Sequence, residues 1–261
     1  MDMKLGCVIM MATALVVPAG VPAAPEAGSV AETARREWTF TPDPALPNVL
    51  ILGDSISIGY TLEVRTLLKG KANVFRPVTP NGKGAENCSG TTLGVKAVER
   101  WLAVRKWDVI HFNFGLHDMK RVTEAGGTRN SNKPEDPWQA SVEQYVANLA
   151  EIVAKLKATG ARLVFATTTP VAAGTTNPWR DPAEPARYNA VAQEIMKANG
   201  IRVNDLFALC EPQLGQIQLR QNVHFNAEGS RLMAEQVAKV IAEELNHKLI
   251  SALRLESISS W

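Results

Sequence analysis

A serine at the end of a predicted buried strand is the residue of this chain best placed to act as a nucleophile. Ser55 follows an apolar run over residues 48–52, within Gly53-Asp54-Ser55, and small residues then lead into a helical segment. A buried parallel strand ends at the carboxyl edge of its sheet, where the following turn points one side chain into a crevice and frees backbone N–H groups. A serine hydroxyl is a weak nucleophile by itself, so this placement requires a histidine base at the same edge.

Three of the histidines are distinguished by their sequence surroundings. His111 lies within a run of β-formers, so we interpret it as a histidine of a core strand. His247 lies near the end of a long amphipathic helix, where a solvated histidine is common. His224 stands on the loop before the last predicted helix, with Asn226 as the expected N-cap. A histidine on that loop can reach a neighbouring loop at the same sheet edge, so His224 is the predicted base.

The elements that must position Ser55 and His224 alternate along the chain. Predicted strands cover residues 48–53, 72–78, 107–114, 161–167 and 201–205, and predicted helices cover residues 59–69, 93–104, 138–159, 184–199 and 226–246. This alternation predicts an α/β fold with a parallel sheet, and right-handed crossovers bring the carboxyl ends of the strands to one edge. The 261 residues, 46% of them hydrophobic, can bury one such core. A net charge of +2 without blocks of like charge gives no indication of a nucleic-acid partner.

These motifs resemble those of the SGNH, or GDSL-type, hydrolase superfamily over roughly residues 47–246. The first family block is matched by Gly53-Asp54-Ser55, and the resemblance assigns Ser55 the role of nucleophile. Ser89-Gly90-Thr91 fits the second block, which implies an oxyanion hole that includes the N–H groups of Ser55 and Gly90. The resemblance also implies a three-layer α/β/α flavodoxin-like sandwich with a five-stranded parallel sheet.

The third family block departs from its usual pattern. Gly-x-Asn-Asp is the family's sequence, and here it reads Gly115-Leu116-His117-Asp118. The side-chain donor of the oxyanion hole is therefore expected to be His117, because a neutral imidazole offers one N–H for a developing oxyanion. The tautomer of His117 then matters, since that N–H must face the substrate oxygen.

The fifth family block departs as well. Asp-x-x-His is usual, and here the sequence is Gln221-Asn222-Val223-His224, so the base is present without the acid. A Ser–His dyad is physically acceptable, since loss of the acid of a triad leaves substantial activity. The group that orients His224 could be a backbone carbonyl near Gln221, the amide oxygen of Gln221, or Asp205. We favour a carbonyl or amide acceptor and interpret Asp205 as structural.

The first residues have the pattern of a targeting sequence. Residues 1–24 combine an early lysine, an apolar stretch and a small-residue end, which predicts a signal peptide that removes Cys7. An uncleaved anchor is the alternative. The expected organisation is thus a signal peptide over 1–24, a lead-in segment over 25–46, a hydrolase domain over 47–248 and a tail over 249–261 of unknown role. The mature protein is expected to be periplasmic or secreted, without stable membrane insertion.

Export leaves two cysteines in a compartment that permits disulfides. Cys88 precedes the predicted oxyanion residue Gly90, and Cys210 precedes the loop that leads to His224. One hypothesis is a Cys88–Cys210 disulfide that joins these loops. The alternative is two buried free cysteines.

Two long connections, residues 120–137 and 168–185, are expected to line the mouth of the site. Trp179 and Arg180 are the candidate substrate-binding residues within the second. An exposed tryptophan could stack on a sugar face, or it could instead attach its loop to the domain. The sequence has no long apolar lid, which favours small acyl groups on a polar carrier over lipids at a membrane surface.

These features together predict an exported serine esterase that removes short acyl groups, most simply acetyl, from carbohydrate or another polar carrier through an acyl-enzyme. No metal or other cofactor is required. The carbohydrate part rests on the resemblance and the compartment. Two alternatives stay open: an O-acyltransferase that uses the same residues, and a non-catalytic glycan-binding pseudo-esterase that has lost the site.

Overall fold

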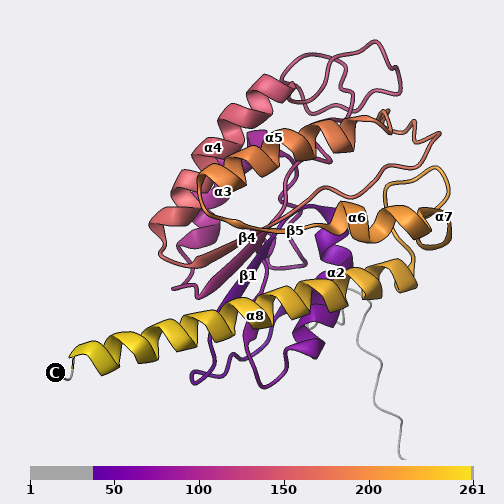
Figure 1. Cartoon of the computed structure of the whole chain (residues 1–261). Helices are drawn as coiled ribbons and strands as arrows, with labels where there is room; N and C mark the ends of the chain where they lie inside the picture. Colours follow the sequence, from indigo (N-terminus) through magenta and orange to yellow (C-terminus); the bar gives the residue numbers. More distant parts are fainter. Residues whose placement is uncertain (1–37, 260–261) are drawn as a thin grey trace, which may run out of the picture.

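The computed structural model describes residues 38–259, with side chains described as far as Lys248. The predicted signal peptide over residues 1–24 and most of the lead-in segment lie outside the described residues. The sheet consists of five parallel strands in the order β2-β1-β3-β4-β5 (Figure 1). These strands are β1 (Asn48–Leu52), β2 (Asn73–Phe75), β3 (Val109–Phe112), β4 (Arg162–Ala166) and β5 (Arg202–Asn204).

Helices cover both faces of this sheet. On one face lie α3 (Thr91–Leu102), α4 (Val142–Ala158) and α5 (Glu184–Ala198), and on the other lie α2 (Ser55–Leu67) and α8 (Ala227–Ser259) (Figure 1). The short elements α6 (Leu206–Cys210), the 3-10 helix η1 (Glu211–Gln213) and α7 (Leu214–Ile217) connect β5 to the loop before α8. The predicted three-layer α/β/α sandwich with a five-stranded parallel sheet is confirmed.

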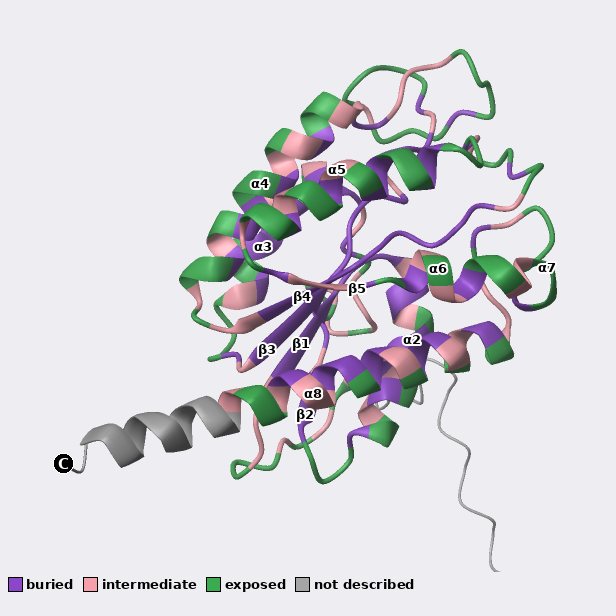
Figure 2. Ribbon diagram, viewed as in Figure 1, coloured by how far each residue is buried: buried purple, intermediate pink, exposed green. Residues whose placement is uncertain are grey.

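The central strands β1, β3 and β4 are mostly apolar because successive residues face opposite helical layers. In β1, Val49 and Ile51 belong to the core cluster shared with α2 and α8. Leu50 and Leu52 belong to the cluster shared with α3, α4 and α5. Figure 2 shows the central strands buried between the two layers. Such a sheet leaves its carboxyl edge, where the strand ends meet loops, as the place for polar chemistry.

Several element boundaries differ from the sequence prediction, and two of them have a clear cause in the chain. Helix α2 begins at Ser55 rather than at residue 59, because the Asp54 side chain accepts a hydrogen bond from the Ile56 N–H at 2.9 Å and caps the helix. Helix α8 continues to Ser259, so residues 249–259 of the predicted tail extend the helix. After Gly229 the chain has no glycine or proline that would end it.

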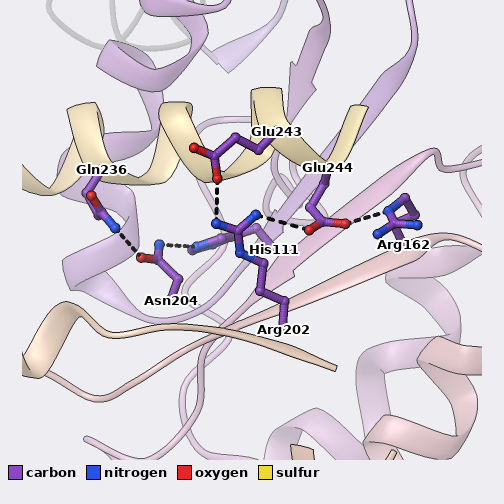
Figure 3. A network of polar contacts seen from close by, with 7 residues as sticks. All are labelled: His111, Arg162, Arg202, Asn204, Gln236, Glu243 and Glu244. Carbon is purple, nitrogen blue, oxygen red and sulfur yellow. Dashed lines mark hydrogen bonds and ion pairs between the residues drawn. The ribbon is translucent and has the colours of Figure 1, made fainter. Parts of the chain in front are cut away.

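A polar network fastens α8 to the edge of the sheet (Figure 3). Arg202 contacts Glu243 at 2.5 Å and Glu244 at 3.2 Å, and Arg162 pairs with the same Glu244. Within the network, Asn204 Nδ2 lies 3.1 Å from Nε2 of the fully buried His111. Burial lowers the pKa of His111 to about 3. The interpretation of His111 as a core-strand histidine is confirmed.

Between residues 38 and 259, no helix combines the length and the apolar character that a membrane crossing requires.

Candidate active site

The turn between β1 and α2 presents Ser55. Gly53 has a φ of +155°, a backbone conformation that side chains rarely adopt, and a Cβ there would lie 2.8 Å from Ser57 Oγ. Glycine is therefore required at the first position of the turn. Asp54 then caps α2, and Ser55 becomes the first residue of the helix, half-buried at the carboxyl edge of the sheet.

A buried arginine holds this turn from beneath. Arg76 Nη1 donates to Ser57 Oγ at 2.7 Å, and Nη2 donates to the carbonyl oxygens of Gly53 and, at 3.1 Å, of Asp54. Its Nε and Nη2 also donate to the Glu86 carbonyl, at 3.2 and 3.1 Å. Burial lowers the pKa of Arg76. Arg76 thus connects the nucleophile turn to the chain that leads toward the oxyanion loop.

His224 lies against the nucleophile. Ser55 Oγ and His224 Nε2 are 2.7 Å apart, although the two residues are separated by 169 positions in the sequence. The predicted N-cap Asn226 accepts from the Gly229 N–H at 2.9 Å, which fixes where the loop ends and α8 begins. The distance allows Nε2 to take the hydroxyl proton directly.

The residue that orients His224 is Asn222, which the sequence analysis did not name. Asn222 Oδ1 accepts from the His224 backbone N–H at 3.0 Å and lies 2.7 Å from His224 Nδ1. A backbone N–H only donates, so the atom that faces it is the amide oxygen, and Nδ1 must carry the ring proton. The lone pair of Nε2 is then directed at Ser55. The expectation of an amide acceptor is met, although by Asn222 rather than by Gln221.

The other two candidates for this role point elsewhere. Gln221 has a φ of +51°, and its side chain packs near Gly174. Asp205 Oδ1 accepts from Thr167 Oγ1 at 2.9 Å and from the Ala208 N–H at 3.1 Å, and so caps α6. The structural interpretation of Asp205 is confirmed.

The loop before α3 carries the proposed oxyanion donor Gly90. The Cys88 N–H donates to the Gly53 carbonyl at 3.1 Å, which holds this loop beside the nucleophile turn. Among the described residues, the N–H groups of Ser55 and Gly90 have no hydrogen-bond acceptor. Both groups are thus available to a ligand oxygen.

Asp118 anchors the same loop from below. Its Oδ1 accepts from the Thr91 N–H at 2.8 Å and from Thr91 Oγ1 at 2.5 Å. A Cβ on Gly90 would lie 2.9 Å from Asp118 Oδ2, so only glycine fits. Burial is the main cause that raises the pKa of Asp118 to about 7. Asp118 therefore supports the loop rather than His117.

His117 reaches the pocket with one ring nitrogen. Its Nδ1 lies 3.1 Å from Ser89 Oγ, which leaves Nε2 for the pocket. Burial is the main cause that lowers the pKa of His117 to about 4, so the ring is neutral at pH 7. When the Ser89 hydroxyl donates to Nδ1, Nε2 carries the proton, as an oxyanion donor must.

These residues surround a pocket of about 350 Å³ at the carboxyl edge of the sheet. The lining residues are mostly polar: Ser55, Asn87, Leu116, His117, Lys120, Asn130, Thr175, Asn177, Pro178, Arg180, Asn222, Val223 and His224. Both long connections contribute walls, as their position in the sequence predicted. Ser55, His117 and His224 thus share one pocket, and Gly90 lies on the neighbouring loop.

The two substrate-binding candidates differ in position. Arg180 is buried and lines the pocket, and its Nε donates to the Leu116 carbonyl at 2.8 Å. Trp179 is not among the described residues that line this pocket. Its backbone joins the two connections, because its N–H donates to Ser131 at 2.9 Å and its carbonyl accepts from Arg121 at 3.0 Å. The backbone of Trp179 therefore fastens one loop to the other.

The disulfide hypothesis for Cys88 and Cys210 is wrong. Both thiols are free and buried. Cys88 packs in the core cluster shared with α3, α4 and α5, whereas Cys210 packs in the cluster shared with α2 and α8. The sheet separates these two clusters, so the cysteines lie on opposite faces.

Among the described residues, no group of three or more histidine, cysteine, aspartate or glutamate side chains is arranged to hold a metal ion. His247 is exposed on α8 and is not among the described residues that line the pocket.

A serine paired with a histidine at the carboxyl edge of an α/β/α sandwich is the arrangement of a serine hydrolase. The chain belongs to the GDSL-like lipase/acylhydrolase family, whose sequence profile matches residues 51–232. No curated protein matches the chain significantly.

Solved structures of related fold include several esterases. A lipase/acylhydrolase from Enterococcus faecalis has a TM-score of 0.60 at 19% identity, and the match covers 76% of this chain and 96% of that one. The acetyl xylan esterase AlAXEase has a TM-score of 0.56 at 15% identity, with coverage of 74% and 99%. Axe2, an acetylxylan esterase from Geobacillus stearothermophilus, has a TM-score of 0.55 at 16% identity, with coverage of 76% and 94%. At these identities the likeness is one of fold.

Proposed function

We propose that this protein is a serine esterase that removes short acyl groups, most simply acetyl, from carbohydrate or another polar carrier. The observation that carries the proposal is the chain of contacts from Asn222 Oδ1 through both ring nitrogens of His224 to Ser55 Oγ, at 2.7 Å each. Membership of an acylhydrolase family supports ester hydrolysis. Structural neighbours named as acetyl xylan esterases favour an acetylated sugar as the substrate.

In the first half of the reaction, His224 Nε2 takes the Ser55 proton while Oγ forms a bond to the ester carbonyl carbon. The carbonyl electron pair moves onto oxygen, which the N–H groups of Ser55 and Gly90 and the Nε2–H of His117 stabilise. When this intermediate collapses, the bond from carbon to the alcohol oxygen breaks. The protonated His224 gives its proton to that oxygen, and an acyl-enzyme on Ser55 remains.

In the second half, water replaces the alcohol. His224 Nε2 takes a proton from the water as its oxygen attacks the acyl carbon, and the same three donors stabilise the second oxyanion. Collapse breaks the bond to Ser55 Oγ, and His224 returns the proton to Oγ. The products are one carboxylic acid and one alcohol for each water consumed. Asn222 holds Nδ1–H throughout and contributes orientation without a full negative charge.

Two further parts of the proposal concern the compartment and the alternative of a non-catalytic protein. Residues 1–24 support export of the protein. The retained contacts among Ser55, His224 and Asn222 argue against a pseudo-esterase, because a decayed site has no reason to keep a paired nucleophile and base.

Hydrolysis of p-nitrophenyl esters by the purified protein tests the proposal. We expect turnover of the acetate ester that declines with longer acyl chains. Ser55→Ala and His224→Ala should each lower kcat by about a thousandfold or more. His247→Ala is a matched histidine control and should retain wild-type kcat. Mass spectrometry of rapidly quenched protein should find the acetyl group on Ser55. Equal rates for wild type and Ser55→Ala across chain lengths would overturn the proposal. Product analysis with an added sugar acceptor separates hydrolysis, which yields the free acid, from acyl transfer, which yields an acylated sugar.

A further inference from the structure

Two buried cations lie in the wall of the catalytic pocket. Lys120 is 7% exposed and Arg180 is 5% exposed, and both line the same pocket as Ser55 and His224. They come from different connections, Lys120 just after the turn that carries His117 and Arg180 from the loop after β4. The Arg180 Nε–H donates to the Leu116 carbonyl at 2.8 Å, which holds the guanidinium beside that turn.

Neither cation has an acidic partner within the described residues. No carboxylate oxygen of the residues from 38 to 248 lies within 4.0 Å of the Lys120 ammonium or the Arg180 guanidinium. Two buried carboxylates, Asp54 and Asp118, act on these cations only from beyond 4.0 Å: the charge of Asp54 raises the pKa of Arg180, and the charge of Asp118 raises the pKa of Lys120. Each is held on its own loop through one oxygen, because Asp54 Oδ1 accepts from the Ile56 N–H and Asp118 Oδ1 accepts both hydrogen bonds of Thr91.

Three other arginines have carboxylate partners or several hydrogen-bond acceptors. Figure 3 shows Arg162 and Arg202 contacting Glu243 and Glu244 at the edge of the sheet. The buried Arg76 forms no ion pair with a described carboxylate, but it donates to three backbone carbonyls and the Ser57 hydroxyl. For Arg180, by contrast, the Leu116 carbonyl is the acceptor found among the described residues.

Placing two such cations side by side carries an electrostatic cost. Burial lowers the pKa of Arg180 to about 10. Burial also lowers the pKa of Lys120, and the positive charge of Arg180 is the next largest cause. Buried cations without a carboxylate in direct contact are unfavourable, and an anion that enters the pocket would relieve both effects.

We propose that Lys120 and Arg180 form a binding site for a carboxylate on the substrate, so that the enzyme acts on acyl esters of an acidic sugar such as a uronic acid. The inference rests on the proposed esterase function and specifies its substrate. Arginine and lysine together suit a carboxylate, since the guanidinium offers paired donors and the ammonium a point charge. The amides of Asn87, Asn130 and Asn177 line the rest of the pocket and suit sugar hydroxyls. A volume of about 350 Å³ is in the range of small-molecule sites.

A pair of matched substrates tests the carboxylate site. Acetylated glucuronic acid and its methyl ester present the same acetyl group, and only the first carries a charge. Deacetylation is measured for both with the wild-type protein and with Lys120→Met and Arg180→Gln. We expect the wild type to favour the charged substrate in kcat/KM by about 10- to 100-fold, which is the size expected for hydrogen bonds to charged groups. Each variant should lose most of that preference, mainly through a higher KM, and added salt should weaken it in the wild type.

Lys197→Met removes one positive charge from the exposed end of α5 and is the control for net charge; it should keep the wild-type preference. The p-nitrophenyl succinate ester places the anion on the acyl side, and a preference for it over the acetate would overturn the assignment of the carboxylate to the sugar. Equal kcat/KM for the two sugars in the wild type would overturn the anion site while leaving the esterase intact. If the wild-type protein does not hydrolyse p-nitrophenyl acetate, the proposed esterase function itself is contradicted.

Discussion

Asn222 holds His224 through a single oxygen atom. Asn222 Oδ1 accepts a hydrogen bond from the backbone N–H of His224 at 3.0 Å and lies 2.7 Å from His224 Nδ1. The first contact is a local turn in which an asparagine side chain bonds the backbone two residues later. The second fixes the ring tautomer that a general base requires. The side chain of a short-range turn thus orients the His224 ring, a role that the aspartate has in a Ser-His-Asp triad.

Substitutions of Asn222 test this role. Asn222→Ala should lower kcat by about 10- to 100-fold and leave KM close to wild type, because orientation of the base is lost while the pocket stays intact. Asn222→Asp should keep or raise kcat, since a carboxylate holds the same proton and stabilises the imidazolium. Steady-state kinetics on an acetate ester checks both variants. Wild-type kcat in Asn222→Ala would assign the orientation of His224 to another group.

His117 is expected to act as the third donor to the oxyanion. His117→Ala should lower kcat by about 100- to 1,000-fold, the usual cost of one lost donor. His117→Asn returns the family's amide to this position and should recover much of that loss. Ser89→Ala removes the partner of Nδ1 and frees the ring to adopt either tautomer, so a smaller decrease is expected. If His117→Ala and wild type turn over equally, His117 lies outside the reacting centre.

The layers of the fold could be predicted from the sequence, because strands buried on both faces contain apolar runs such as Val49–Leu52. The sequence was insufficient where the outcome depends on contacts between distant segments. The sequence predicts loops around both Cys88 and Cys210. Only the three-dimensional fold shows that they lie on opposite faces of the sheet. Arg180 was named as a binding candidate, but its neighbour Lys120 was not, because two loops had to be brought together first.

The site residues divide in the same way. Ser55 and His224 stand in motifs that can be seen in the chain, and the structure brings them within 2.7 Å. Asn222 was missed because the family pattern directs attention three residues before the histidine, to Gln221. The asparagine two residues before His224 is a recognisable turn signal, and that signal could have found it.

Gly90 should tolerate no side chain. Gly90→Ala places a Cβ 2.9 Å from Asp118 Oδ2, so the loop must shift and carry the Gly90 N–H away from the oxyanion. We expect a clear loss of kcat together with a destabilisation of about 1–3 kcal/mol. Gly84→Ala is the matched control, because a Cβ there meets nothing within 4 Å. Kinetics and thermal unfolding of the two variants provide the comparison, and equal behaviour would remove the need for glycine at position 90.

Arg76 is expected to position the nucleophile turn. Arg76→Met leaves the carbonyls of Gly53, Asp54 and Glu86 without this donor, and we expect destabilisation by about 3 kcal/mol or more. Arg76→Lys should recover part of the stability, because one ammonium cannot satisfy all the acceptors that a guanidinium reaches. Arg231→Met breaks an exposed ion pair on α8 and should change the unfolding free energy by less than about 1 kcal/mol. Urea unfolding of the three variants tests the assignment, which similar losses in Arg76→Met and Arg231→Met would contradict.

The neutral histidines predict how stability depends on pH. Burial lowers the pKa of His117 from 6.5 to about 4, so between these values the unfolded chain binds a proton that the folded protein does not. The unfolding free energy must then fall as the pH decreases through this window, by up to about 1.4 kcal/mol per pH unit for one histidine. Asp118, whose pKa is raised to about 7, acts in the opposite direction, because its stabilising contribution is lost as the pH rises from 3.8 toward 7. In a comparison of wild type with His117→Asn the contributions of Asp118 and the other carboxylates cancel. Urea unfolding at several pH values should show that the unfolding free energy of His117→Asn depends less steeply on pH than that of the wild type. An equal dependence in both proteins would show that His117 is protonated equally in the folded and unfolded states.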